Sequence, residues 1–334
     1  MYALARPLLF RIEAERAHRL TLSGLNAAHR LGLLSLLSAA PVRAPVRLMG
    51  LDFPNRVGLA AGLDKNAVCV DAMGALGFGF VEVGTLTPQP QDGNAAPRVF
   101  RLPRARAVIN RMGFPNDGVE AAVARLAARR FTGVCGVNIG KNATTPLERA
   151  TDDYIAALRA VYGVADYVTI NISSPNTQGL RSLQGGDQLR PLLDGLLEAR
   201  SQLSAATAKR VPLVVKLSPD LSDDELAETA AVITAVGIDG VIATNTTLER
   251  TAVAGLPHAD RPGGLSGEPL RERSVVVVKQ LRQLLGPAMP LIGVGGISAA
   301  GHMRAMLDAG ADLVQVYTGL VYRGPALVRE LLRV

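Results

Sequence analysis

Short runs of apolar, often β-branched residues recur along the chain, and most of them end abruptly in glycine or polar residues. A strand that is covered on both faces of a parallel sheet has this continuous apolar pattern. The pattern therefore predicts eight buried parallel strands. They are residues 57–62, 80–84, 134–139, 167–172, 212–217, 240–244, 290–294 and 313–316.

Segments compatible with helices lie between most of these strands. They are residues 118–130, 152–162, 188–204, 222–236, 272–285 and 299–309. Strands and helices that alternate at this spacing indicate βαβ units and a parallel sheet. Eight such units predict an α/β fold of the closed (β/α)₈, or TIM, barrel type.

The first forty residues have a different pattern and predict two short helices. Leucines recur at helical spacing, and several arginines supply positive charge between them. Basic and apolar faces together favour a helix pair lying at a membrane interface. Neither a run of about 18 apolar residues that could span a bilayer nor a signal-peptide cleavage site is present in the sequence. We expect a helical subdomain over residues 1–40 and the barrel over 41–334, although the helices could instead cap the bottom of the barrel.

Composition fits one enzyme-sized domain. Of the 334 residues, 48% are hydrophobic and only 4% are aromatic, so Ala, Val, Leu and Ile must build the core. The net charge of +7 is compatible with nucleic acid, an anionic membrane or an acidic substrate. The two cysteines, Cys69 and Cys135, have no metal-ligand spacing, so we predict no metal site and a reducing compartment.

Polar side chains gather where the predicted strands end. Residues 167–176, YVTINISSPN, pass from a buried strand directly into Asn171, Ser173, Ser174 and Asn176. In an α/β barrel the carboxyl ends of the strands form the active-site face. Asn and Ser also close turns readily, but similar polar ends recur on other strands, so the pattern favours an active site.

Two further features suggest an anionic ligand. Glycine-rich segments follow the seventh and eighth strands, at residues 293–298 and 317–319, where barrels commonly bind phosphate. A tight turn is the alternative for either segment alone. Lys216 lies inside an apolar strand, where a charge is costly unless it faces an anion or an electron-rich ring. A lysine that extends its ammonium group off the strand end is the other interpretation.

Seven motifs, spread in order along nearly the whole chain, resemble those of dihydroorotate dehydrogenases. They are AAGLDKN (60–66), INRMGF (109–114), NIGKN (138–142), INISSPNTQGLR (170–181), ATNTT (243–247), GGLSG (263–267) and GVGGI (293–297). The N-terminal helices resemble the extension of the class 2 enzymes, which depend on quinone. Ser174 stands where class 1 enzymes have cysteine, which also points to class 2.

The resemblance implies FMN as cofactor and oxidation of (S)-dihydroorotate to orotate in de novo pyrimidine biosynthesis. Glycine would let the backbone approach the phosphate, and Lys216 would stabilise negative charge on the reduced ring. The residues expected around FMN are Ala61, Gly62, Leu63, Asp64, Lys65, Thr85, Asn138, Asn171, Lys216, Thr244, Gly267, Gly296, Tyr317 and Thr318.

The same resemblance implies a set of substrate-binding and catalytic residues. Dihydroorotate is a cyclic imide with a carboxylate, so amides and one cation suit it. The expected substrate residues are Lys65, Asn110, Arg111, Met112, Gly113, Phe114, Asn171, Asn176, Asn245 and Thr246. Ser174 would be the base, and Thr177 with Phe114 would form the proton exit. Pro115 and Gln178 depart from the family pattern and would alter loop rigidity.

Ubiquinone or menaquinone would be the final electron acceptor, at His18, Arg101 and Tyr317. The resemblance further implies a monomer, peripheral on the cytoplasmic face of the cell membrane, that binds no nucleic acid. Two rival functions share some features. A tRNA dihydrouridine synthase would need a catalytic cysteine in an active-site loop and an RNA-docking domain. A non-catalytic membrane adaptor would leave Lys65, Lys216 and the asparagines without a role.

Overall fold

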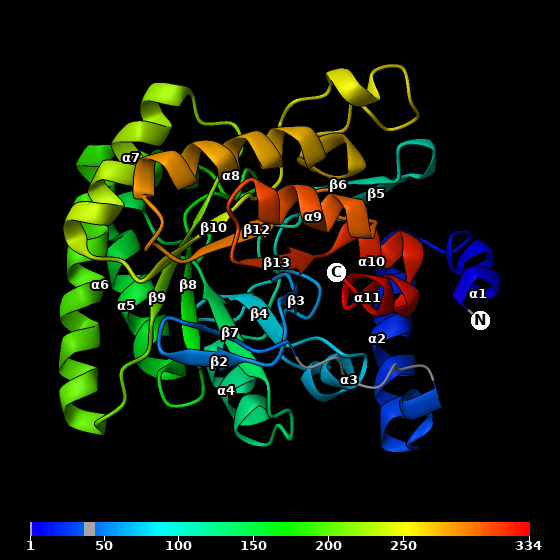
Figure 1. The fold of residues 1–334 in the computed structure, drawn as a ribbon, viewed down its shortest axis with the longest axis horizontal. Coiled ribbons are helices and arrows are strands. Elements are labelled where there is room, and N and C mark those ends of the chain that lie inside the picture. Colours follow the sequence, from blue (N-terminus) through cyan, green and yellow to red (C-terminus); the bar gives the residue numbers. More distant parts are fainter. Residues whose placement is uncertain (1, 37–43) are drawn as a thin grey trace.

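The structure, a computed structural model, describes residues 2–36 and 44–334. Eight parallel strands close into a barrel, which confirms the predicted TIM fold (Figure 1). Around the barrel the strands follow in chain order: β3 (Val57–Leu59), β4 (Phe80–Leu86), β7 (Val134–Ile139), β8 (Tyr167–Asn171), β9 (Leu213–Leu217), β10 (Gly240–Ala243), β12 (Leu291–Val294) and β13 (Leu313–Val316).

Six of the helices that surround the barrel lie at the predicted places: α4 (Val119–Ala127), α5 (Ala150–Val161), α6 (Gly186–Thr207), α7 (Asp223–Val236), α8 (Arg271–Leu285) and α9 (Ala300–Asp308). The helices α3 (Val70–Ala75), α10 (Thr318–Arg323) and α11 (Pro325–Leu331) were not predicted. Local chemistry sets some of their ends. Ser222 and Glu225 form a capping box before α7, and Gly237, with φ of +78°, ends that helix.

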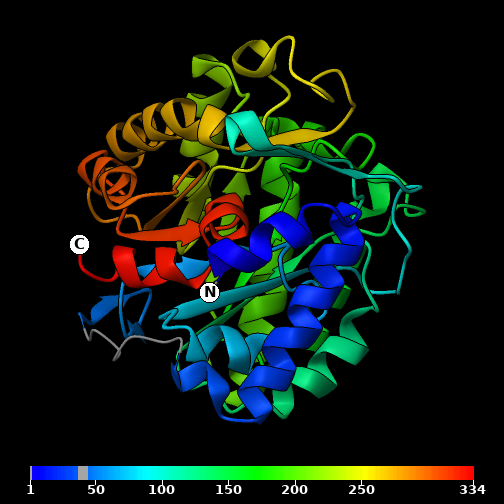
Figure 2. The ribbon, with the colours of Figure 1, turned by 90° about the vertical axis from the view of Figure 1, so that its right-hand side faces the viewer.

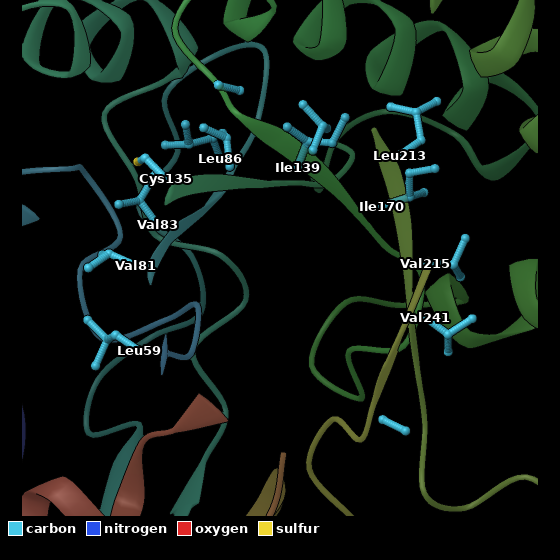
Figure 3. Packing of buried hydrophobic residues seen from close by; sticks show 14 of the residues in the cluster. Leu59, Val81, Val83, Leu86, Cys135, Ile139, Ile170, Leu213, Val215 and Val241 are labelled. Atoms are coloured by element: carbon cyan, nitrogen blue, oxygen red, sulfur yellow. The ribbon is translucent and has the colours of Figure 1, made fainter. Parts of the chain in front are cut away.

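Alternate residues of the strands build two separate cores. Outward-facing side chains such as Val137, Ile139 and Ile170 pack with the helices, and Figure 3 shows part of this cluster. Inside the barrel, Tyr167 lies against Gly136, where an added Cβ would meet the tyrosine ring at 2.1 Å. Glycine at this position is therefore required for the tyrosine to fill the barrel interior.

A hairpin of β1 (Val46–Leu48) and β2 (Leu51–Phe53) closes the bottom of the barrel. Phe53 is fully buried and stacks edge-on against Phe80, with ring centroids 5.3 Å apart. Both rings belong to one cluster with Val134, Tyr167 and residues from the starts of other strands. The bottom is thus capped by this hairpin and not by the N-terminal helices.

A second small sheet lies above the barrel and was not predicted. It consists of β5 (Val99–Leu102), β6 (Ala107–Asn110) and β11 (Gly264–Gly267), all antiparallel. Arg101 therefore lies in a strand. The sheet carries Asn110 and Gly267 to the carboxyl-end face of the barrel.

Two helices precede the barrel, as predicted: α1 (Tyr2–Leu9) and α2 (Ala14–Arg30), followed by the short 3₁₀ helix Leu33–Leu36. The end of the predicted subdomain, residues 37–40, lies outside the described part. Figure 2 shows both helices beside the barrel, next to α10 and α3. Arg6 Nη1 donates to Tyr322 O at 3.0 Å, and Arg98 forms an ion pair with Glu15 at 2.6 Å.

Candidate active site

A cavity opens at the carboxyl ends of the barrel strands. It contains about 1000 Å³ of space, its open mouth included. Strand ends from around the barrel supply its walls, and β6 and β11 cover one side. Most of the residues predicted for cofactor and substrate line it: Ala61, Gly62, Lys65, Thr85, Asn110, Met112, Gly113, Phe114, Asn171, Ser174, Lys216, Thr244, Asn245, Thr246, Gly267, Gly296, Tyr317 and Thr318.

Three predicted cofactor residues do not line this cavity. The Asp64 carboxylate accepts hydrogen bonds from the backbone N–H groups of Val68 and Cys69, so it holds a turn. Leu63 lines a different cavity. Asn138 lies one layer behind, where its Oδ1 accepts a hydrogen bond from Thr85 Oγ1 at 2.6 Å.

Three residues predicted to bind substrate or take part in catalysis also do not line the cavity. Arg111 donates its guanidinium hydrogen bonds to Pro97 O. Asn176 Nδ2 donates to Asn110 Oδ1 at 3.1 Å, so it supports a lining residue. Thr177 Oγ1 is buried and has no hydrogen-bond partner within the described part of the chain.

The sequence reasoning missed Gln315 and Ser266, which both line the cavity. Ser266 Oγ lies 2.8 Å from Thr318 Oγ1, a predicted cofactor residue. Gln315 is fully buried, and its Oε1 has no partner among the described residues. A polar residue inside the apolar run LVQV is the same signal that identified Lys216, and it could have identified Gln315.

One buried lysine, Lys216, and one half-buried lysine, Lys65, make the cavity electropositive. Lys216, 6% exposed, has its pKa lowered by burial, while the negative charge of Glu82 opposes that change. Burial lowers the pKa of Lys65 to about 8, against the opposing charge of Glu15. Lys65 Nζ donates to Gly62 O at 2.6 Å. In the described ranges no hydrogen bond or ion pair satisfies Lys216 Nζ, which suits a site for an anionic or electron-rich ligand.

Ser174 lines the cavity. It is 5% exposed, and its Oγ accepts a hydrogen bond from Asn176 N at 3.2 Å. No histidine or carboxylate within residues 2–36 and 44–334 is hydrogen-bonded to this oxygen, so the serine is not part of a Ser-His-Asp triad. Phe114, on the same cavity, has φ of +55°, a strained conformation that is typical of functional sites.

A second, larger cavity lies between the N-terminal helices and the barrel. It contains about 1940 Å³, open solvent included, and its walls are largely apolar. The three residues predicted for quinone, His18, Arg101 and Tyr317, all line it. Lys65, Met112 and Tyr317 line both cavities, so these side chains form a shared wall.

Two of the residues predicted for quinone have distinct roles in this cavity. Burial lowers the pKa of His18 to about 4, and the charge of Lys65 adds to this effect, so the imidazole is neutral at pH 7. The Arg101 guanidinium donates to the carbonyls of Leu9, Phe10 and Ile12 and stacks on the Phe10 ring. Arg101 therefore also holds the end of α1 against β5.

The two cysteines lie away from both cavities. Cys69 and Cys135 are buried, and burial raises the pKa of each thiol to about 12. The described residues contain no group of His, Cys, Asp and Glu side chains that could hold a metal ion. None of the helices in the described ranges is long and apolar enough to cross a membrane.

The fold and the cavity define an α/β-barrel enzyme with its active site at the carboxyl ends of the strands. A sequence profile described as dihydroorotate dehydrogenase matches residues 43–333. The chain belongs to the dihydroorotate dehydrogenase family, as its motifs indicated, and is thus a flavin-dependent oxidoreductase.

Dihydroorotate dehydrogenases from other organisms match the sequence over nearly the whole chain. It is 56% identical over 330 residues to the dihydroorotate dehydrogenase (quinone) of Stutzerimonas stutzeri, covering 99% of this chain and 96% of that one. Over 333 residues it is also 56% identical to the enzyme of the same name from Chromobacterium violaceum, covering 100% and 97%. The crystal structure of dihydroorotate dehydrogenase from Eimeria tenella in complex with ferulenol matches with a TM-score of 0.86 and 37% identity, covering 96% of this chain and 89% of that one.

Proposed function

We propose that the protein oxidises (S)-dihydroorotate to orotate in de novo pyrimidine biosynthesis, with FMN as cofactor and a membrane quinone as final electron acceptor. The observation that carries this proposal is the pair of cavities with a shared wall. The more polar of the two contains Lys216 and Ser174, and the other is largely apolar and lies under the N-terminal helices. Electrons can pass through such a wall while the two substrates stay apart.

The residues of the polar cavity fit FMN. Gln315 Oε1 and Thr246 Oγ1 are buried there without partners in the described chain, and both can accept a hydrogen bond from a ligand. Gly295 and Gly296, with φ of +131° and +70°, and Gly267 with φ of +103° allow close backbone approach to a phosphate. Bound FMN would supply the hydride acceptor, and Lys216 would stabilise negative charge on its reduced ring.

The chain's own residues would then bind and deprotonate the substrate. Lys65 is a cation for the carboxylate, and the amides of Asn110, Asn171 and Asn245 suit the imide. Ser174 would accept the proton from C5 as hydride leaves C6. Because serine is a poor base, the proton needs an exit. The Thr177 hydroxyl, which has no partner among the described residues, supports that role together with Phe114.

The second cavity would receive the quinone. Neutral His18 and cationic Arg101 can bind the quinone oxygens, while the remaining walls suit a quinone ring with its isoprenoid tail. Leu4, Leu8 and Leu31 are 81%, 64% and 72% exposed on the N-terminal helices and at their end. These leucines, with exposed arginines nearby, support peripheral binding to a membrane surface. The cytoplasmic face and the monomeric state are proposed from the resemblance to class 2 enzymes alone.

Anaerobic stopped-flow absorbance tests the proposal directly. The purified yellow protein is mixed with dihydroorotate and then with a short-chain ubiquinone, NAD⁺ or fumarate. We expect the flavin to bleach and to be reoxidised rapidly by quinone alone. Bleaching that only NAD⁺ or fumarate reverses would overturn the quinone assignment, and no bleaching at all would overturn the substrate.

Replacing Lys216 with methionine is expected to weaken FMN binding about tenfold to hundredfold. The substitution keeps much of the side-chain volume but removes a charged donor, and hydrogen bonds to charged groups are worth ~1.5–3 kcal/mol. Fluorescence titration of the apoprotein with FMN measures the change. Lys279→Met on the exposed face of α8 is the matched control. Equal affinity in both variants would contradict a cofactor role for Lys216.

Replacing Leu4 and Leu8 together with aspartate is expected to reduce binding to phospholipid vesicles by about tenfold or more for each leucine lost, since each buried leucine contributes ~1.5–3 kcal/mol. Flavin reduction by dihydroorotate should stay unchanged, because neither residue lines the polar cavity. Vesicle sedimentation measures binding. Leu248→Asp, at a leucine 52% exposed on the barrel, is the control. Undiminished binding by the double variant would place the membrane contact elsewhere.

A further inference from the structure

A buried carboxylate lies inside the barrel, one layer below the active-site cavity. Glu82 on β4 is fully buried and accepts three hydrogen bonds: from Asn138 Nδ2 at 2.8 Å, Tyr167 OH at 2.9 Å and Gln315 Nε2 at 2.7 Å. Burial raises the pKa of Tyr167 well above 10, and the charge of Glu82 adds to this, so the phenol stays a donor. The negative charge of Glu82 also opposes the lowering of the pKa of Lys216 on β9, three strands away around the barrel.

An ionised carboxylate can only accept hydrogen bonds, and this settles the orientation of the amides around it. Asn138 must turn its NH₂ group to Glu82, so its Oδ1 faces the cavity side. There it accepts from Thr85 Oγ1 at 2.6 Å and from Asn171 Nδ2 at 3.1 Å.

The same direction of hydrogen bonding, from the amide NH₂ of one residue to the amide oxygen of the residue nearer Glu82, continues outward to the substrate side of the cavity. With its NH₂ group used by Asn138 and Thr85, Asn171 presents its Oδ1, which accepts from Asn245 Nδ2 at 3.2 Å. The Oδ1 of Asn245 in turn accepts from Thr246 N at 2.8 Å. The three amides therefore all point the same way, starting from Glu82.

Gln315 forms a second, shorter branch. Its NH₂ group donates to Glu82, so its Oε1 is the atom left over. That oxygen is buried, and the described residues offer it no partner, although Gln315 lines the cavity. A flipped amide would instead bring a donor to the cavity and place an oxygen against the carboxylate, which would repel it.

We propose that Glu82 is a positioning residue that sets the donor and acceptor pattern of the active site. It makes Gln315 an acceptor toward the ligand ring and, through Asn138, fixes which amide atoms of Asn171 and Asn245 the ligands meet. The ligand chemistry that fits is a planar ring with imide N–H and C=O groups. The identity of those ligands, FMN and orotate, rests on the proposed function.

Glu82→Gln and Tyr167→Phe separate this role from simple packing. Both remove one polar feature of the same buried cluster, but only glutamine brings a donor to the place of the carboxylate and lets the amides flip. We expect Glu82→Gln to weaken both FMN and orotate binding about tenfold or more, and Tyr167→Phe to change both less than about threefold. FMN fluorescence and the orotate-induced shift of the flavin spectrum measure the two affinities, and circular dichroism checks the fold.

A second substitution tests whether the orientation of the amide donors and acceptors causes the loss of binding. In the double variant Glu82→Gln with Asn138→Asp, the glutamine can donate to the carboxylate introduced at position 138, which again accepts from Thr85 and Asn171. We expect orotate to bind the double variant at least about fivefold more tightly than Glu82→Gln alone. Equal effects of Glu82→Gln and Tyr167→Phe, or no recovery in the double variant, would overturn the inference. Failure of the wild-type protein to bind FMN would overturn the proposed function instead.

Discussion

Replacing Ser174 with alanine is expected to slow flavin reduction by dihydroorotate about 10²- to 10⁴-fold, the usual cost of losing a general base. FMN should remain bound, because the cavity walls around Lys216 and Gln315 are unchanged. The serine is buried at the cavity, and in the part of the chain that is described no histidine or carboxylate is bonded to its Oγ that could take over proton removal. Anaerobic single-turnover bleaching of the flavin measures the rate.

Ser173→Ala is the matched control for this prediction. Ser173 is the neighbouring buried hydroxyl, and its Oγ accepts from Asn245 Nδ2 at 3.0 Å, but it does not line the cavity. Its removal should slow bleaching less than about tenfold. If Ser174→Ala bleaches as fast as the control, Ser174 is not the base.

Much of the fold was predictable because parallel strands buried on both faces have a distinctive local sequence. All the barrel strands except β7 end in or next to residues that line the cavity, so identifying the strands also located Asn171, Lys216 and Tyr317. The barrel then brings these residues together, since all parallel strands point their carboxyl ends to one face. Their joint placement on one cavity needed no information beyond the strand order.

The small sheet and the polar layer inside the barrel could not be predicted from the sequence. Strand β11 pairs with β6 although more than 150 residues of sequence separate Gly264 from Asn110. No local sequence pattern predicts such a long-range pairing. Glu82 stands in the run FVEVG, where one carboxylate looks like an exposed position of a strand. Only the closed barrel reveals that it faces Tyr167 and Gln315. The partners of a charge inside the barrel depend on which strands lie across from it, and only the tertiary structure decides that.

The N-terminal helices were predicted from local periodicity, but their function depends on how they dock. Arg98 and Glu15 hold α2 to the loop before β5, and Arg101 holds the end of α1. These contacts leave an apolar cavity beneath the helices instead of a packed interface. A cavity that is kept open at the cost of packing contacts supports a binding role for the helices over a purely structural one.

Deleting residues 1–40 is therefore expected to lower quinone turnover about hundredfold or more, because the quinone would lose the walls that position it. Flavin reduction by dihydroorotate should stay within a few fold of the wild-type rate, since none of residues 2–36 lines the polar cavity. The two half-reactions are measured separately by stopped flow. An equal loss of both rates would indicate that the helices serve the stability of the barrel.

Deletion would also expose apolar residues such as Met73 and Leu76, which line the cavity beneath the helices. A single substitution in the full chain therefore tests the quinone site without that exposure. Ala17 is buried on α2 and lines the cavity beneath the N-terminal helices, so Ala17→Phe should fill part of it. Ala27→Phe places the same ring on the exposed side of the same helix. We expect Ala17→Phe to raise the KM for quinone at least about tenfold and to leave the KM for dihydroorotate unchanged, and Ala27→Phe to change neither. The two variants share helix, residue type and added volume, and the unchanged KM for dihydroorotate controls for a general disturbance of the fold by the buried ring. Equal KM values for quinone in the two variants would remove the quinone from this site.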